Sequence, residues 1–113
     1  MKNLDIAEIG NKIENHVLFP AKTNVEFIQI LSPNKINMRV WERGAGETLA
    51  CGSGSCAVQS VSFKKKLTDR KVEVILRGGS LFIEVNDNWQ ITMTGPVANV
   101  FTGILSKEFL IDE

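Results

Sequence analysis

The chain has little of several residue types on which whole classes of structure depend. Its 113 residues contain two cysteines, one histidine, three prolines and no tyrosine. Two cysteines do not make a disulfide framework, and a bridge between Cys51 and Cys56 is disfavoured if a helix starts near Gly52, because more than a helical turn then separates them. A zinc site needs three or four ligands, and these cysteines with His16 are too few, so we expect no metal site.

Net charge and long apolar runs are also lacking. The 13 basic and 13 acidic residues give a formal net charge of zero, which provides no electrostatic footprint for nucleic acid or an anionic membrane surface. Apolar runs reach only about six residues, against the roughly 20 that cross a bilayer, and the first residues form no signal-peptide core. We therefore expect a cytoplasmic protein without nucleic-acid or membrane partners, and a single domain over 1–113.

The apolar periodicity predicts an α+β fold. A helix capped by Asp5 is predicted over 5–15, strands over 24–31 and 35–42, a loop over 44–50, a second helix over 52–65, a meander of strands over 71–76, 81–85 and 89–94, and a further strand over 100–105. The tail, 106–113, is either docked or frayed. Because strands precede and follow one helix without βαβ alternation, we expect a mostly antiparallel sheet wrapped around that central helix.

The most specific pattern is a cysteine followed by a glycine-rich turn, Cys51-Gly-Ser-Gly-Ser55, at the predicted start of the second helix. The positive end of the helix dipole and the unpaired backbone N–H groups stabilise a thiolate there, so Cys51 is a candidate acid/base. The same N–H groups can hold a substrate carboxylate. Just upstream, Glu42 can receive an ammonium group and Arg43 a carboxylate, although such a pair at a strand end is otherwise a surface ion pair.

These residues resemble a known family. The segment Glu42-Arg-Gly-x-Gly-Glu-Thr-x-Ala-Cys-Gly-Ser-Gly54 is similar to the second active-site segment of diaminopimelate epimerases, and Thr23-Asn-Val-Glu-Phe27 and Met93-Thr-Gly-Pro96 extend a likeness that covers about residues 4–103. Enzymes of this family have two pseudo-symmetric halves, each with one catalytic cysteine. The resemblance implies one half of that fold, the C-terminal portion, because this chain holds no Cys-Gly-Asn-Gly type segment; the N-terminal half with the second cysteine would be a partner.

The resemblance also implies a function. It implies an isomerase without a cofactor, independent of pyridoxal phosphate, that interconverts LL- and meso-diaminopimelate in lysine and peptidoglycan biosynthesis by a two-cysteine mechanism. Cys51 would be one catalytic cysteine. The substrate-binding residues implied are Asn24, Glu42, Arg43, Gly52 and Ser53. Considered alone, Asn24 can also be a turn cap, and Cys56 is expected to be a packing residue.

Other interpretations stay open. A proline-racemase-like enzyme would also use two cysteines, but Asn24 and the Glu42-Arg43 pair suit a substrate with a second charged end. A phenazine-biosynthesis-type isomerase shares the fold but lacks a cysteine at this place. A non-catalytic half-domain could fold or self-associate through unpaired strand edges. We expect the isolated chain to be inactive without the partner thiol, unless two Cys51 side chains meet across a homodimer.

Overall fold

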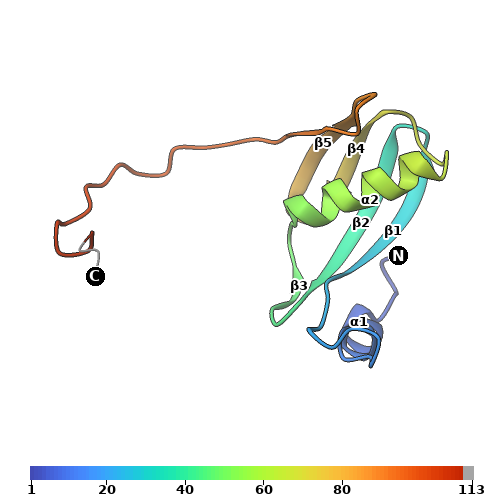
Figure 1. The fold of residues 1–113 in the computed structure, drawn as a ribbon, viewed down its shortest axis with the longest axis horizontal. Coiled ribbons are helices and arrows are strands. Elements are labelled where there is room, and N and C mark those ends of the chain that lie inside the picture. The colour runs from blue at the N-terminus through green and yellow to red at the C-terminus, as the bar shows by residue number, and fades with distance from the viewer. Residues whose placement is uncertain (111–113) are drawn as a thin grey trace.

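The structure is a computed structural model that describes residues 1–110. Its elements are α1 (Ile6–Glu14), β1 (Val25–Ser32), β2 (Lys35–Glu42), β3 (Gly46–Thr48), α2 (Gly52–Lys64), β4 (Lys71–Leu76), β5 (Gly79–Val85) and β6 (Ile91–Thr94). The helix α2 lies across one face of the sheet, and α1 sits at the end of the sheet near β3 (Figure 1). The α+β class and the mostly antiparallel sheet predicted from the sequence are confirmed.

The strands form one sheet in the order β1-β2-β4-β5-β6, with β3 paired to β2. Four pairings are antiparallel, and one is parallel, between residues 35–37 of β2 and 73–75 of β4. The parallel pairing requires a crossover, because two parallel neighbours cannot be joined by a tight turn. Here β3 and α2 form that crossover, which places the start of α2 above the sheet.

The core lies between α2 and the sheet. Alternate residues of β2, β4 and β5 point to this face, and Ile36, Met38, Val40, Val74 and Ile83 are completely buried there. The helix contributes Val58 together with small or polar side chains, including Ser55 and Ser62. Small side chains let the helix approach the sheet closely, so the position of the helix start is fixed by packing.

Two regions differ from the sequence prediction. Residues 46–48, predicted as loop, form β3, because Gly44 and Gly46 take φ values of 75° and 77° and turn the chain back onto β2. The last meander strand begins at Ile91 and not at Trp89, which has φ 59° in the preceding turn. Both differences arise at turns whose geometry depends on the paired strand.

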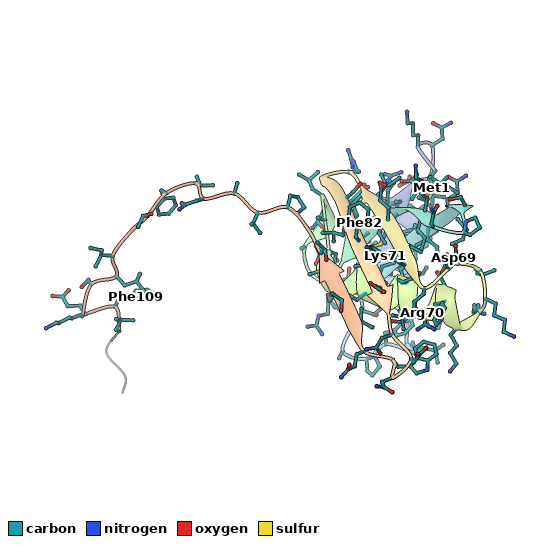
Figure 2. All side chains as sticks on the ribbon, turned by 90° about the horizontal axis from the view of Figure 1, so that it is seen from above. Met1, Asp69, Arg70, Lys71, Phe82 and Phe109 are labelled. Atoms are coloured by element: carbon teal, nitrogen blue, oxygen red, sulfur yellow. The ribbon has the colours of Figure 1, made fainter. Side chains whose placement is uncertain are left out.

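The predicted strand over 100–105 is wrong. After β6 the chain leaves the sheet, runs away from it without helix or strand, and ends in a turn over 107–110 (Figure 1). Its apolar side chains are exposed, as for Ile104 at 99% and Phe101 at 83%, and Phe109 lies far from the sheet (Figure 2). An apolar pattern forms a strand only when another strand offers hydrogen bonds, and no described strand does so here. Of the predicted tail, 106–110 does not dock on the sheet, and 111–113 lie outside the described residues.

Both helices are short. Of residues 1–110, neither helical segment combines the length and the apolar character needed to traverse a bilayer.

Candidate active site

Cys51 is the N-cap of α2, as the sequence predicted. Its backbone is extended, with φ −149° and ψ 106°, and its carbonyl accepts the first helical hydrogen bond from Ser55 at 3.0 Å. Its Sγ accepts a hydrogen bond from the Gly54 N–H at 3.3 Å and lies 3.6 Å from the Ser53 hydroxyl. The Cys51 side chain is only 7% exposed and so is shielded from bulk water.

Gly52 and Ser53 are the first two residues of α2. Their N–H groups have no acceptor within the helix, because the first turn of any α-helix leaves its donors unpaired. A Cβ on Gly52 would lie 3.0 Å from the sulfur of Met93 in β6, so a glycine is favoured by close packing. The start of α2 therefore offers backbone donors next to the Cys51 sulfur.

A polar cleft of about 390 Å³ opens beside this helix start. It is lined by Lys22, Thr23, Asn24, Glu26, Arg43, Ser53, Gly54 and Ala57. Three of the predicted site residues, Asn24, Arg43 and Ser53, thus line one cleft. The other three lie next to lining residues: Cys51 Sγ contacts the Gly54 N–H and the Ser53 hydroxyl, Gly52 precedes Ser53, and the Glu42 carboxylate acts electrostatically on Glu26.

Asn24 and Arg43, which both line this cleft, are in direct contact. The Asn24 Oδ1 accepts a hydrogen bond of 2.8 Å from the Arg43 backbone N–H, which fixes the end of β2 against the start of β1. The Asn24 side-chain NH₂ makes no hydrogen bond within residues 1–110. The Arg43 guanidinium has one long bond, 3.4 Å to the Ala21 carbonyl, and no ion pair in the described part of the chain. Both groups can therefore bind a ligand.

The Glu42 carboxylate is oriented by β3. It accepts a hydrogen bond from the Thr48 hydroxyl, and Glu42 pairs with Gly46 in the sheet. The next residue of β3, Glu47, is bound by the Arg39 guanidinium, with Nε–Oε1 at 2.7 Å and Nη2–Oε2 at 3.0 Å, and this pairing lowers the pKa of Glu47. Glu47 thus holds β3 in place, and Thr48 orients Glu42.

Cys56 lies within α2 and is partly buried, with both cysteines in the free form. Burial raises the pKa of Cys56, and the nearby Cys51 adds to this effect. A thiol that resists ionisation supplies little thiolate near neutral pH, which is in keeping with the packing role expected of Cys56.

Two carboxylates near the site were missed by the sequence analysis. Glu14, at the end of α1, is buried and accepts hydrogen bonds of 2.9 Å from the Trp41 indole and from the Gly44 N–H. Glu26 lines the cleft itself. The sequence contains a pattern that could have identified each of them. Glu14 falls four residues after Gly10 on the buried face of α1. Glu26 is two positions after Asn24 and therefore on the same face of the strand.

The chain is similar to proteins of one named family. A family model described as "Diaminopimelate epimerase" matches residues 1–100. Relatives named diaminopimelate epimerase include one from Desulfitobacterium hafniense, 51% identical over 109 residues, which cover 96% of this chain and 38% of the relative. Another, from Heliobacterium modesticaldum, is 54% identical over 101 residues, which cover 88% of this chain and 36% of the relative. The chain therefore spans less than two-fifths of the length of these relatives.

A solved structure shares the fold. The crystal structure of a Bacillus anthracis phenazine biosynthesis protein of the PhzF family aligns with a TM-score of 0.57 and 19% identity, over 79% of this chain and 28% of that chain. At this identity the likeness shows the arrangement of helix and strands alone. With a family model that matches residues 1–100 and relatives about half identical, the chain belongs to the diaminopimelate epimerase family.

Proposed function

We propose that this chain carries one half of the active site of a diaminopimelate epimerase, in which Cys51 is one of two acid/base residues. The observation that carries the proposal is the place of the Cys51 sulfur, which caps α2 beside a cleft lined by Asn24, Arg43 and Ser53. The names of the relatives support diaminopimelate as the substrate.

Inversion of an α-carbon without a cofactor needs two groups on opposite faces of the substrate. One thiolate takes the α-proton and becomes a thiol, and the electron pair of the C–H bond passes to the α-carbon and its carboxylate. The second thiol gives its proton to the opposite face and becomes a thiolate. Protons and charge balance, and the enzyme ends with its two sulfurs in exchanged protonation states. These two proton transfers need no pyridoxal phosphate.

The developing carbanion needs electrostatic stabilisation. We infer that the N–H groups of Gly52 and Ser53 bind the α-carboxylate, because they are unpaired donors at the positive end of the α2 dipole. Preorganised donors of this kind contribute about 3–4 kcal/mol each in other enzymes. Gly52 also permits close approach, since it carries no side chain between its backbone and the ligand.

The remaining site residues fit a substrate with two charged ends. We infer that Glu42, oriented by Thr48, receives the α-ammonium group. The Arg43 guanidinium and the Asn24 amide then bind the distal amino-acid end, because both have donors available at the cleft. A proline-racemase-like substrate has no second charged end, so these residues favour diaminopimelate.

The second cysteine has to come from elsewhere. We propose that it lies in a polypeptide segment equivalent to the part of the relatives that this chain does not match, and that the chain alone does not turn over substrate. The complete enzyme would then act in lysine and peptidoglycan biosynthesis in the cytoplasm. A homodimer that brings two Cys51 residues together, and a self-associating half-domain without activity, are the competing possibilities.

Proton NMR in D₂O tests this proposal. LL- or meso-diaminopimelate is incubated under reducing conditions with the chain, and with the chain plus the unmatched segment of the Desulfitobacterium hafniense relative. The proposal is supported if the α-proton signal disappears only in the combined sample. This exchange should be abolished by Cys51→Ala and retained in Cys56→Ala. Exchange by the chain alone supports the homodimer, and the absence of exchange in every combination contradicts the substrate or the half-site assignment.

A further inference from the structure

Glu26 lies next to the Cys51 sulfur without taking part in the binding scheme above. An ideal Cβ on Gly54 would stand 2.8 Å from a Glu26 carboxylate oxygen and 3.1 Å from Cys51 Sγ. The Glu26 carboxylate oxygen and the Cys51 sulfur are therefore both close to the same position on the first turn of α2. The distance between these two atoms cannot exceed the sum of their distances from that Cβ. Glu26 also lines the cleft, so it faces the place where the substrate would bind.

The surroundings of Glu26 oppose negative charge. Burial raises the pKa of Glu26, and the Glu42 carboxylate raises it further, against a backbone hydrogen bond that lowers it. Carboxylates nevertheless titrate about four pH units below thiols, so Glu26 is charged in the pH range where thiols ionise. A fixed negative charge at this distance disfavours a second one on the sulfur.

Other charged and titratable groups face the same region. Glu42 of β2 adds negative charge, Lys22 and Arg43 at the cleft add positive charge, and Cys56 on α2 interacts with Cys51. The helix dipole and the Gly54 N–H favour the thiolate. Of the two acidic groups, Glu26 is the one placed against the first turn of α2 itself.

We propose that the Glu26 carboxylate, set beside the Cys51 sulfur, keeps this residue in its protonated form, so that Cys51 is the proton donor in the resting half-site. The inference rests on the proposed function, in which one sulfur must begin as a thiol and the other as a thiolate. Glu26 is then a positioning residue for the thiol proton. It touches no reacting atom and acts through Cys51.

The test measures how the rate of Cys51 alkylation by iodoacetamide depends on pH. The full chain is used in a Cys56→Ala background, so that only one thiol reacts, and only the thiolate reacts, forming the C–S bond with loss of iodide. Glu26→Gln should move the midpoint of the profile to lower pH by at least about half a unit, which is about threefold more thiolate well below the midpoint.

Two variants serve as controls. Glu84→Gln makes the same charge change at an exposed position of β5 and should leave the midpoint unchanged. Glu84 lies six residues after Gly78, the residue of the β4–β5 turn whose N–H donates a hydrogen bond to the Leu49 carbonyl near the start of α2. Glu26→Asp keeps the charge and should retain a midpoint above that of Glu26→Gln. An unchanged or higher midpoint in Glu26→Gln, or an equal shift in Glu84→Gln, overturns the proposal.

A second measurement covers the case in which the Glu26 variants fail to fold. In the unaltered chain, the ¹³C resonance of the Glu26 carboxyl should show an inflection as the neighbouring thiol ionises, and Cys51→Ser should remove it. Absence of that inflection overturns the proposal. Neither measurement uses diaminopimelate or turnover, so their outcome is independent of the exchange experiment that tests the function.

Discussion

The carboxylate of Glu14 accepts a hydrogen bond of 2.9 Å from the indole Nε1 of Trp41. Its other oxygen accepts the Gly44 N–H at 2.9 Å. One buried side chain of α1 therefore holds the residues on both sides of the Glu42-Arg43 pair. The helix α1 contributes nothing to the cleft lining, yet it fixes the end of β2 and the loop at Gly44, where Glu42 and Arg43, the proposed substrate-binding residues, lie.

Replacement of Glu14 by glutamine should weaken substrate binding more than it slows the chemical step. The amide keeps one acceptor oxygen but presents an NH₂ to a site built for an acceptor, so the loop at Gly44 loses a partner. In the combined sample described above, we expect a higher KM with a nearly unchanged kcat. Glu8→Gln is the matched control, because Glu8 sits on the same helix in an exposed ion pair with Lys12. An equal effect of both variants would contradict this role.

Stability should fall when the pH drops below about 4.5. Hydrogen bonds from Trp41 and Gly44 lower the pKa of Glu14, and the Arg39 guanidinium lowers the pKa of Glu47, each from 4.5. A carboxyl whose pKa is depressed by folding contributes stability that is full above its unfolded pKa and is lost as the pH falls through the folded value. Urea unfolding midpoints at pH 7 and pH 3 measure this loss.

The contribution of Glu47 is separable by mutation. Glu47→Gln should reduce the difference between the urea unfolding midpoints measured at the two pH values, because the variant has no carboxylate to protonate at that position. Glu26 acts in the opposite sense, since burial raises its pKa. Its ionisation costs stability as the pH rises through the window above 4.5, so Glu26→Gln should steepen the loss on acidification. An unaltered pH dependence in Glu47→Gln would contradict the assignment.

The apolar residues of the sheet and of the C-terminal segment should respond differently to truncation. Ile83→Ala removes a completely buried side chain of β5 and should cost about 2–5 kcal/mol of unfolding free energy. Ile104→Ala, at a position that is 99% exposed, should change it by less than about 0.5 kcal/mol. Chemical denaturation of both variants measures the contrast. A large loss in Ile104→Ala would show that residues 100–105 pack on the sheet after all.

Gly10→Ala should destabilise the chain although alanine favours helix. Helix propensity alone predicts a gain of about 1 kcal/mol. A Cβ at position 10, however, would lie 2.6 Å from Cγ and 2.8 Å from Cβ of Trp41, atoms close to the backbone that cannot move freely. We expect a net loss of about 1–3 kcal/mol. Asn11→Ala, on the exposed side of α1, is the control and should be neutral or slightly stabilising in thermal unfolding.

Features set by neighbouring residues could be predicted from the sequence. The Asp5 cap of α1, the Cys51 cap of α2 and the alternation in β2 depend on hydrogen bonds and periodicity within a few positions. The position of Cys51, Gly52 and Ser53 at the start of α2 followed from the same local pattern, while their roles in a site stay a prediction from the family resemblance. The Gly10 position shows the limit of this approach, because its glycine weakens the helix locally and is required by a tryptophan 31 positions away.

Features that depend on distant partners could not be predicted. The strand β3 exists because Gly44 and Gly46 return the chain to β2, and Glu14 is buried because Trp41 and Gly44 supply its donors. The proximity of Glu26 to Cys51 follows from the way α2 lies across β1 and β2. Residues 100–105 have the apolar pattern of a strand, but a strand forms only with a neighbour to which it can bond.

The parallel pairing of β2 with β4 has a consequence for how the Cys51 thiol becomes buried. The β1–β2 hairpin and the β4–β5–β6 meander can each form from contacts close in sequence, but their junction has to wait until the intervening crossover is in place. That crossover carries Cys51 and α2. The junction of the two sheet portions and the burial of the Cys51 sulfur therefore both depend on contacts between residues distant in sequence, and we expect them to form together.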